Sequence, residues 1–453
     1  MTKKNGVSFN YEAHDNGEGY YKNTALEYTQ CTEEGLDVEA FREIFLATEK
    51  LPDCEAKEKI ADVLFDVVTN AGSVEGYPHS EPSDLEGIRA LRDGFAVKGE
   101  VKGDLADKIR GAWLGRICGC LLGKPVEGMR TDSLVPLLKD TGNYPMNRYI
   151  RKSDFTEEIL ARFDAGFPTR CWADNIDCAP IDDDTNYTVM AQLMIDRFGR
   201  NFTPENVGRM WIDSQSKYSY FTAERTAFIN MVNGFCPPHT AVYKNPYREW
   251  IGAQIRGDYY GYINPAKPEL ATEMAWRDAS VSHVKNGIYG EMFVSAMLAS
   301  AAVSDDVEEV IAGGLGQIPA TSRLYKAIKK IISMYKEGES AEACMAYIHT
   351  CYDEHTSHGW CHTISNAMIV AAALLWGEGD YGKSVCLAVQ TGFDTDCNGA
   401  TVGSICGIMK GIDNMDKEWY EGFNGTLSTS LCKYPRVKLD DFVEKTMKHI
   451  DAK

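Results

Sequence analysis

The chain has 453 residues, of which 44% are hydrophobic, so it can bury a large core and is not expected to be disordered. Its 66 acidic residues outnumber 47 basic ones, which gives a formal net charge of −19. This surplus argues against nucleic acid as a partner, because such binding relies on basic side chains that neutralise phosphates; a small phosphorylated ligand stays compatible, since a bound cation can invert the local field.

The start of the chain, residues 1–35, is polar and is expected to be an irregular arm. It offers no apolar core of a secretion signal, and no apolar run in the sequence approaches the ~18 residues of a membrane span. The 14 cysteines are scattered along the chain, and reduced thiols fit this distribution better than disulfides. We therefore expect a cytoplasmic protein without a membrane partner.

Two amphipathic patterns follow this arm and predict helices. The apolar positions are Val38, Phe41, Ile44 and Phe45 in the first, and Ile60, Val63, Leu64 and Val67 in the second. Residues 70–84, with several glycines and prolines, are typical of a connector. Residues 1–103 are accordingly predicted to form a small helical extension, and residues 104–453 to form the main domain.

A glycine-rich helix is predicted at the start of the main domain, over residues 105–122, with Asp104 as its N-cap. Glycine recurs every four residues, at 111, 115, 119 and 123, which indicates a helix face made for close contact. Pro125 then ends the helix and places Glu127 on the following loop. A carboxylate held there is a candidate general acid or base, although the spacing alone fits a solvated glutamate equally well.

Two acidic turns, each ahead of a predicted helix, carry the strongest indication of function. They are Asp182, Asp183 and Asp184 in the first turn and Asp394 and Asp396 in the second. Carboxylates at a helix N-terminus can simply cap free N–H groups and meet a favourable dipole. The alternative is that both turns converge on a divalent metal. Five carboxylates without a histidine form an all-oxygen set, which suits Mg²⁺, Mn²⁺ or Ca²⁺ rather than Zn²⁺.

The remaining segments read mostly as helices. Residues 200–268 are rich in aromatic residues (Tyr218 and Phe221 among them), proline, glycine and asparagine, which predicts long loops over a pocket. Apolar periodicity predicts helices at 187–197, 290–302, 320–336, 340–352, 364–376, 380–390 and near the C-terminus. No stretch sustains the alternation of a strand, so the predicted class is all-α. Glycine and other small residues at 399, 403 and 407 again mark a helix face for close contact.

A histidine-rich stretch, residues 354–362, invites a zinc interpretation. It contains Glu354, His355, His358, Cys361 and His362. Their order is not that of a metalloprotease helix, and no second ligand pair stands at finger spacing. We expect polar groups at the edge of a pocket here rather than a zinc ion.

Together, four of these segments resemble the ADP-ribosylglycohydrolase family, which includes the ADP-ribosylarginine and ADP-ribosylserine hydrolases and the dinitrogenase-reductase activating glycohydrolase. The segments are the glycine-rich helix that ends at Glu127, the Asp182–Thr185 element, the stretch Asp278–His283 and the Gly392–Ala400 element. They span about residues 105–411. The first hundred residues have no counterpart in the minimal family fold.

The resemblance implies an orthogonal all-α bundle around two divalent metal ions, Mg²⁺ or Mn²⁺. The ligands carried over by position are Asp182, Asp183, Asp184, Asp394 and Asp396. Three residues depart from the family's motifs: Asp182 replaces a threonine, Cys120 an aspartate, and Cys397 a threonine or serine. Cysteine is a poor ligand for Mg²⁺, so either the extra charge of Asp182 compensates or the metal preference shifts toward Mn²⁺; the departures also leave the substrate open.

The implied reaction is hydrolysis of an N- or O-ribosidic bond to ADP-ribose, on a protein side chain or on a small molecule. Glu127 would be the general acid or base, and His283 and Asn286 would lie near the substrate. Two other functions stay open: a hydrolase of simpler glycosides or nucleosides that uses the same metal centre, and a non-catalytic ADP-ribose-binding protein. The presence of Glu127 together with both acidic turns favours an enzyme.

Overall fold

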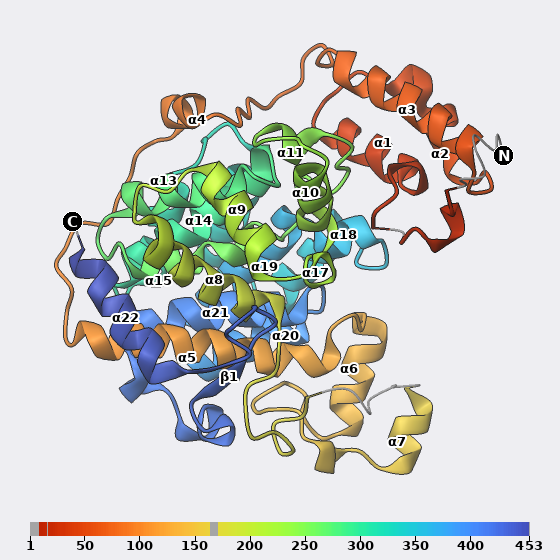
Figure 1. Cartoon of the computed structure of the whole chain (residues 1–453). Helices are drawn as coiled ribbons and strands as arrows, with labels where there is room; N and C mark the ends of the chain where they lie inside the picture. Colours follow the sequence, from red (N-terminus) through yellow and green to blue (C-terminus); the bar gives the residue numbers. More distant parts are fainter. Residues whose placement is uncertain (1–8, 16, 164–170, 453) are drawn as a thin grey trace.

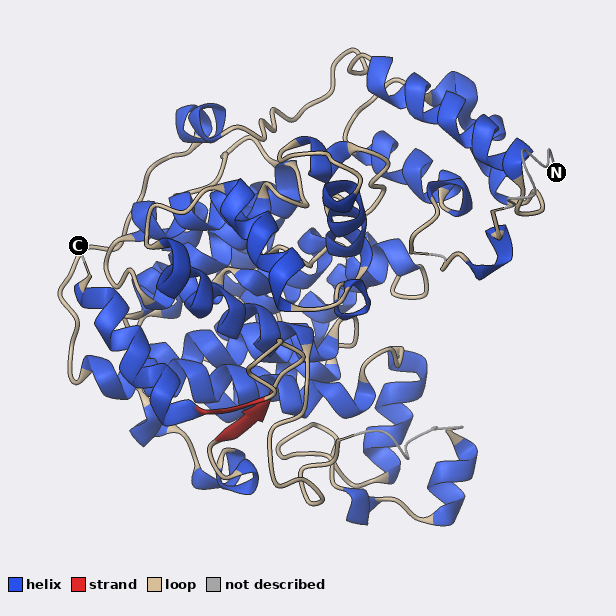
Figure 2. Cartoon of the chain, viewed as in Figure 1, coloured by secondary structure: helices blue, strands red, loops and turns tan. Residues whose placement is uncertain are grey.

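The computed structural model describes residues 9–15, 17–163 and 171–452, and helices dominate this part of the chain (Figure 2). Its strands are the short β1 (Thr426–Ser428) and β2 (Arg436–Lys438), which pair antiparallel with Leu427 opposite Val437. The predicted all-α class is therefore confirmed. None of the described helices has the length and apolar character that a membrane crossing needs.

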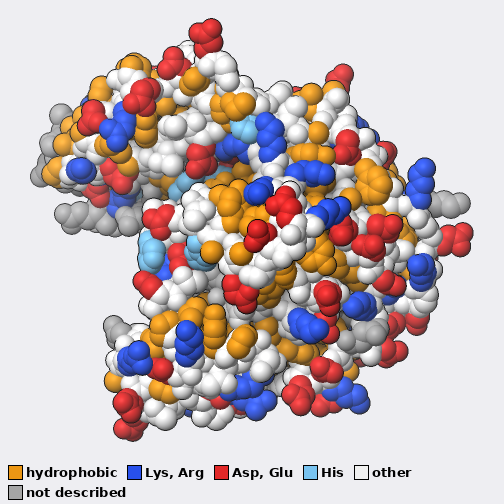
Figure 3. Space-filling view, turned by 180° about the vertical axis from the view of Figure 1, so that it is seen from behind, with side chains coloured by type: hydrophobic (Ala, Val, Ile, Leu, Met, Phe, Trp, Pro, Cys, Tyr) orange, Lys and Arg blue, Asp and Glu red, His pale blue; other side chains and the backbone are white. Residues whose placement is uncertain are grey.

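Three N-terminal helices form a group beside the main body (Figure 1). They are α1 (Thr24–Glu33), α2 (Arg42–Glu49) and α3 (Glu55–Asn70), and a loop then leads to α4 (Leu85–Leu91). The group has an apolar cluster of its own, in which Cys31, Phe45 and Leu64 are buried. From behind, the surface is hollowed between this group and the region of α6 and α7, and histidine side chains lie along the hollow (Figure 3).

Helices α2 and α3 confirm the two amphipathic patterns, and the connector before α4 is a loop as expected. Helix α1, in contrast, corrects the expectation of an irregular arm over residues 1–35. Its buried side chains are mostly polar, namely Thr24, Glu27, Gln30 and Cys31. A helix that buries polar groups has no apolar stripe, so hydrophobic periodicity does not reveal it. The boundary between residues 103 and 104 stays a prediction.

The main body consists of helices α5 to α22. Their bounds are α5 (Leu105–Gly123), α6 (Thr131–Asp140), α7 (Glu157–Arg162), α8 (Asp183–Phe198), α9 (Pro204–Ser214), α10 (Thr222–Val232), α11 (His239–Val242), α12 (Asp258–Tyr262), α13 (Pro268–Ala279), α14 (Lys285–Ala301), α15 (Val307–Leu315), α16 (Arg323–Lys336), α17 (Ala341–Cys351), α18 (Ser357–Cys361), α19 (Thr363–Trp376), α20 (Tyr381–Gln390), α21 (Thr395–Lys410) and α22 (Leu439–Asp451). The expectation of long loops over residues 200–268 is wrong, because α9 to α12 lie there. These helices are short, so an apolar pattern has few turns in which to repeat.

Helices α5 and α21 lie side by side and in opposite directions (Figure 1). Their glycines face one another in pairs: Gly111 with Gly407, Gly115 with Gly403, and Gly119 with Gly399. A Cβ atom added at Gly115 would lie 2.1 Å from the carbonyl oxygen of Gly403, so a side chain there would force the helices apart. The predicted close-contact faces are confirmed, and they face each other. As a result, the C-terminal end of α5 meets the N-terminal end of α21.

Candidate active site

A cavity of about 370 Å³ lies where the C-terminal end of α5 meets the N-terminal ends of α8 and α21. Its polar lining includes Lys124, Glu127, Asp182, Asp183, Asp394 and Asp396. Glu127 follows the 3₁₀ turn η4 (Lys124–Val126), which continues α5 and contains the helix-ending proline. The two acidic turns, distant in the sequence, thus share one cavity with the loop glutamate, as the sequence predicts.

The first acidic turn begins α8, and its three aspartates have different surroundings. Asp182 is the N-cap: its Oδ1 accepts a hydrogen bond of 2.9 Å from the backbone N–H of Asp184. Its Oδ2 accepts from the Lys124 ammonium at 2.5 Å. Both oxygens of Asp182 therefore have donors, as in the plain capping interpretation, whereas Asp183 lies half-buried in the cavity lining.

Asp184 is fully buried against α5. Its Oδ1 lies 2.9 Å from Nη2 of Arg116, and the same guanidinium lies 3.0 Å from Asp258. Its Oδ2 is also buried but has no hydrogen-bond partner among the described residues. Burial raises the pKa of Asp184 well above its usual range even though Arg116 opposes the shift. One carboxylate oxygen thus fastens α8 to α5, and the other is left for a further partner.

The second acidic turn begins α21 on a strained backbone. Phe393 has a φ of +56°, in the left-handed region that non-glycine residues rarely adopt. The turn is held by the Trp360 indole, which donates to the Phe393 carbonyl, and by Asn366 Oδ1, which accepts from the Asp394 backbone N–H at 3.3 Å. Asp394 is the N-cap but makes no capping bond, and Oδ1 of Asp396 is buried without a partner in the described part of the chain.

Burial and mutual repulsion disfavour the charged forms of the aspartates in this cluster. Burial first, and the charge of Glu127 second, raise the pKa of Asp394 to about 7. Burial and the neighbouring carboxylates also raise the pKa of Asp183 and Asp396 well above the usual range. A divalent cation among these groups would favour their charged forms and lower the same pKa values.

The donor set fits such a cation. Two groups of side chains have ligand atoms within 4.8 Å of one another: Cys120 with Asp182 and Asp184, and Asp184 with Asp396 and Cys397. Asp184 and Asp396, which each have an oxygen without a partner among the described residues, both belong to the second group. A buried polar atom without a partner is costly, and a metal ion bound by this group would supply one. Because each group includes a thiol, the softer Mn²⁺ suits it better than Mg²⁺ does.

Comparison with known proteins agrees with this geometry. The sequence profile of the ADP-ribosylglycohydrolase family matches residues 102–450. The chain belongs to the ADP-ribosylglycohydrolase family. One similar solved structure is described as an "ADP-ribosylglycohydrolase-related protein complex"; it is 17% identical, covers 77% of this chain and 98% of its own, and has a TM-score of 0.47. No curated protein matches the sequence.

Family membership confirms the predicted resemblance and indicates a hydrolase. The structure places two of the predicted site residues elsewhere, however. Among the described residues that line the cavity, neither His283 nor Asn286 appears. Asn286 donates to Glu249 at 2.8 Å, and His283 is buried against the hydroxyl of Ser282 at 2.8 Å. Both side chains contact polar groups away from the cavity, so their expected position beside the substrate is not observed.

The cavity of this family member also has side chains that the sequence analysis did not single out. Lys124 faces Asp182, and Arg116, behind the cavity lining, holds Asp184 from helix α5. Arg116 is the one charged residue in the apolar, glycine-rich stretch 111–123, and this is a signal that could have drawn attention to it. Trp360 lines the cavity too, together with Tyr218 and Phe221 from the segment expected to cover a pocket.

Proposed function

We propose that this member of the ADP-ribosylglycohydrolase family is a divalent-cation-dependent hydrolase of a ribosidic bond to ADP-ribose, carried by a protein or a small molecule. The observation that supports it most is the pair of buried, unpartnered oxygens, Asp184 Oδ2 and Asp396 Oδ1, behind a cavity that Glu127 lines. Cleavage at a sugar C1 builds positive charge on the ring, which a negatively charged cavity stabilises.

The metal ligands in this proposal come from both acidic turns. Asp183, Asp184, Asp394 and Asp396 would hold two ions, Mn²⁺ or Mg²⁺. When bound, such ions orient sugar hydroxyls and lower the pKa of a bound water. Arg116 fixes Asp184, so this ligand is oriented by a cation of the chain itself, whereas Lys124 pairs with the adjacent Asp182.

Glu127 would carry the proton transfer. Its side chain is exposed on a loop, unlike the buried aspartates, so a substrate in the cavity can reach it. As a carboxylic acid it would protonate the leaving group, and as a carboxylate it would accept a proton from the attacking water. Its position directly after the end of α5 places it beside the metal ligands without requiring it to bind the metal.

The aromatic side chains would hold the rest of the substrate. Tyr218 is 64% exposed and Phe221 49% exposed, which is high for such large side chains at the edge of a cavity. Arg130 lies over the Trp360 ring at 5.0 Å. Aromatic faces with a nearby guanidinium suit a ligand that combines a planar base with phosphates.

The test is product analysis by mass spectrometry. The Mn²⁺-loaded protein is incubated with peptides ADP-ribosylated on arginine or serine, and separately with nucleosides and simple ribosides. Release of free ADP-ribose that stops on addition of EDTA is the expected result. Cleavage of nucleosides alone would favour the hydrolase of simpler glycosides, and tight binding of ADP-ribose without turnover would favour a binding protein. Either outcome would overturn the proposal.

A further inference from the structure

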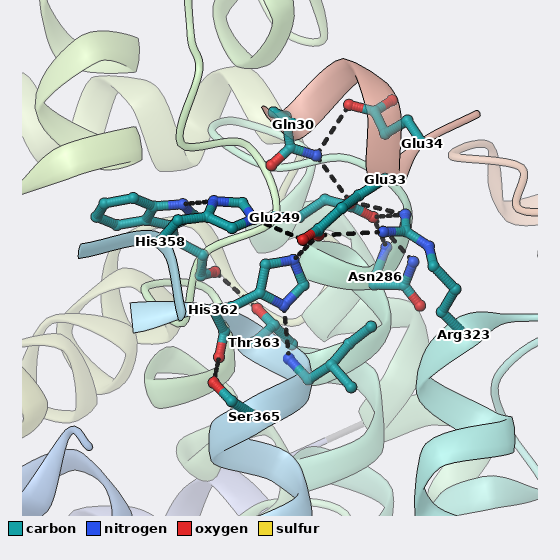
Figure 4. A network of polar contacts seen from close by, with 12 residues as sticks. Gln30, Glu33, Glu34, Glu249, Asn286, Arg323, His358, His362, Thr363 and Ser365 are labelled. Atoms are coloured by element: carbon teal, nitrogen blue, oxygen red, sulfur yellow. Dashed lines mark hydrogen bonds and ion pairs between the residues drawn. The ribbon is translucent and has the colours of Figure 1, made fainter. Parts of the chain in front are cut away.

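Helix α1 of the N-terminal extension is joined to the main body by a buried polar network (Figure 4). Its last turn and cap supply Gln30, Glu33 and Glu34. The ion pairs and hydrogen bonds are Gln30 with Glu249, Glu33 with His358 and His362, and Glu34 with Arg248 and Lys285. Polar contacts of this kind can bind a cation, join two parts of a fold, or fix the position of neighbouring residues.

The cluster of Glu33, His358 and His362 has the composition of a zinc site, with ligand atoms within 4.8 Å of one another. The hydrogen bonds to the imidazoles argue against zinc. Nδ1 of His358 accepts from the Trp250 indole at 3.1 Å, and an indole N–H can only donate. Nδ1 of His362 accepts from the backbone N–H of Ile364 at 3.0 Å. Neither Nδ1 therefore carries a proton, so each neutral ring carries it on Nε2.

Both Nε2 atoms lie close to the same carboxylate. Nε2 of His358 lies 3.1 Å from Glu33 Oε1, and Nε2 of His362 lies 3.3 Å from Glu33 Oε2. A metal at these two Nε2 atoms would have to displace both protons and leave each Nδ1 unprotonated as well. The arrangement is thus a carboxylate in close polar contact with two histidines, each of which is fixed by a hydrogen bond to its Nδ1.

The segment between these histidines forms part of the cavity wall. Trp360 and Cys361 line the cavity, and so does Ile251 on the neighbouring segment. The backbone N–H of Ile251 donates to the Cys361 carbonyl at 2.8 Å, and that of Thr363 donates to the Glu249 carbonyl at 3.0 Å. Glu33 therefore fixes both ends of a short stretch whose middle faces the candidate active site.

A chain of hydrogen bonds continues from this wall to a proposed metal ligand. The Trp360 indole donates to the Phe393 carbonyl, and Asn366 Nδ2 donates to the Trp360 carbonyl at 3.0 Å. Asn366 Oδ1 in turn accepts from the Asp394 backbone N–H at 3.3 Å. Because Phe393 has a φ of +56°, the turn needs such contacts to hold its conformation.

We propose that Glu33 is a positioning residue for the candidate metal site: from the N-terminal extension it fixes His358 and His362, and through Trp360 it holds the turn that presents Asp394. The inference rests on the proposed function, in which Asp394 binds a cation. It gives the extension a role in the active site, although none of α1 lines the cavity.

The test compares two neutralising variants on the same helix. Glu33→Gln removes the negative charge beside the two histidines, and Glu27→Gln removes a buried partner of Arg248, at 2.8 Å; neither Glu27 nor Arg248 lines the cavity. Mn²⁺ affinity is measured by calorimetry, and the bound Mn²⁺ by electron paramagnetic resonance. We expect E33Q to weaken Mn²⁺ binding about 10–100-fold, as loss of a supporting contact does, and E27Q to lower the melting temperature with an unchanged affinity.

An equal change in Mn²⁺ affinity in both variants, or no change in E33Q, would overturn the inference. If E33Q does not fold, Trp360→Phe tests the same link, because it removes the indole N–H that bonds the Phe393 carbonyl; it should weaken Mn²⁺ binding, and an unchanged affinity would count against the inference. Asp396→Asn separates the two hypotheses. If this variant still binds Mn²⁺ as the wild type does, the proposed function fails. If D396N abolishes Mn²⁺ binding but E33Q leaves Mn²⁺ binding unchanged, only the role of Glu33 fails.

Discussion

Two of the acidic clusters that the protein buries differ in how their charge is balanced. In the junction cluster, where α1 meets the main body, Glu249 is fully buried and accepts from Gln30, Asn286 and Arg323. Burial alone would raise the pKa of Glu249, but the Arg323 guanidinium and the other donors hold it at about 2. In the cavity cluster of Asp182, Asp183, Asp184, Asp394 and Asp396, the pKa of Asp394 is raised to about 7.

Burial is common to both clusters, so it does not explain the difference. The junction cluster contains Arg248, Lys285 and Arg323 opposite its glutamates. The cavity cluster has Lys124 and Arg116 opposite five aspartates. A balanced buried cluster joins parts of a fold, whereas an unbalanced one is a place for an ion from solution. The following predictions test this distinction.

The largest effect is expected at Glu127, which adjoins the cavity cluster but is exposed. Glu127→Gln should lower kcat by about 10²–10⁴-fold, the usual contribution of a general acid or base. Its midpoint of urea unfolding should stay unchanged, because Glu127 is exposed. Steady-state kinetics on an ADP-ribosylated peptide and urea titration measure the two quantities. A loss of stability that parallels the loss of activity would mean that Glu127 is structural.

In the junction cluster, neutralising a glutamate should lower the stability of the fold. Glu249→Gln leaves Arg323 buried with less compensation, which typically costs about 3–5 kcal/mol of unfolding free energy. Glu308→Gln is the matched control, because Glu308 pairs with Lys336 at 2.8 Å on the exposed surface, where solvent screens the pair and it contributes little to stability. Chemical denaturation measures both. Equal effects of the two variants would show that the junction cluster is not balanced as described.

The pH dependence of stability provides a third contrast. In the metal-depleted protein, the raised pKa of Asp394 means that the folded state binds more protons than the unfolded state between about pH 4 and 7. The stabilisation that this raised pKa gives the folded state is fully present below pH 4 and is lost as the pH rises through 7. It amounts to about 4 kcal/mol of unfolding free energy at most. The difference in unfolding free energy between the wild type and Asp394→Asn, both in EDTA, should therefore become less favourable to the wild type from pH 5 to 8. A difference that does not vary with pH would refute this.

The smallest effect is expected from the single lysine in the cavity. Lys124→Met removes the ammonium that pairs with Asp182, so a divalent cation should bind roughly tenfold more tightly. Lys244→Met is the control, because Lys244 is similarly exposed and pairs with Asp62, which does not line the cavity. Calorimetric titration with Mn²⁺ compares them. Weaker binding in K124M would indicate that Lys124 supports the metal ligands rather than competing with the metal.

Much of the fold could be predicted because it follows from local patterns. Helices such as α3 and α16 have an apolar stripe, and the glycines of α5 and α21 indicate close contact even without knowledge of the partner. Helix α1 could not be found in this way, since the partners of Glu27 and Gln30 are Arg248 and Glu249, far along the chain. A buried polar face becomes intelligible only when its partners are in place.

The candidate site shows the same limit. The acidic turns and Glu127 were predicted to meet, because carboxylates are costly to bury and each stands at the end of a helix. The role of Lys124 depends on the distance between the ends of α5 and α8, which no local pattern contains. His283 and Asn286 show the opposite case: their residue types suit a substrate site, but they contact Ser282 and Glu249 away from the cavity.

The most direct test of the unbalanced cavity cluster is a calorimetric titration of the metal-depleted protein with Mn²⁺. We predict saturable binding that Asp396→Asn weakens more than about 100-fold and that Glu34→Gln, in the junction cluster, leaves within twofold of the wild type. Binding that survives in D396N, or that falls equally in both variants, would contradict the account.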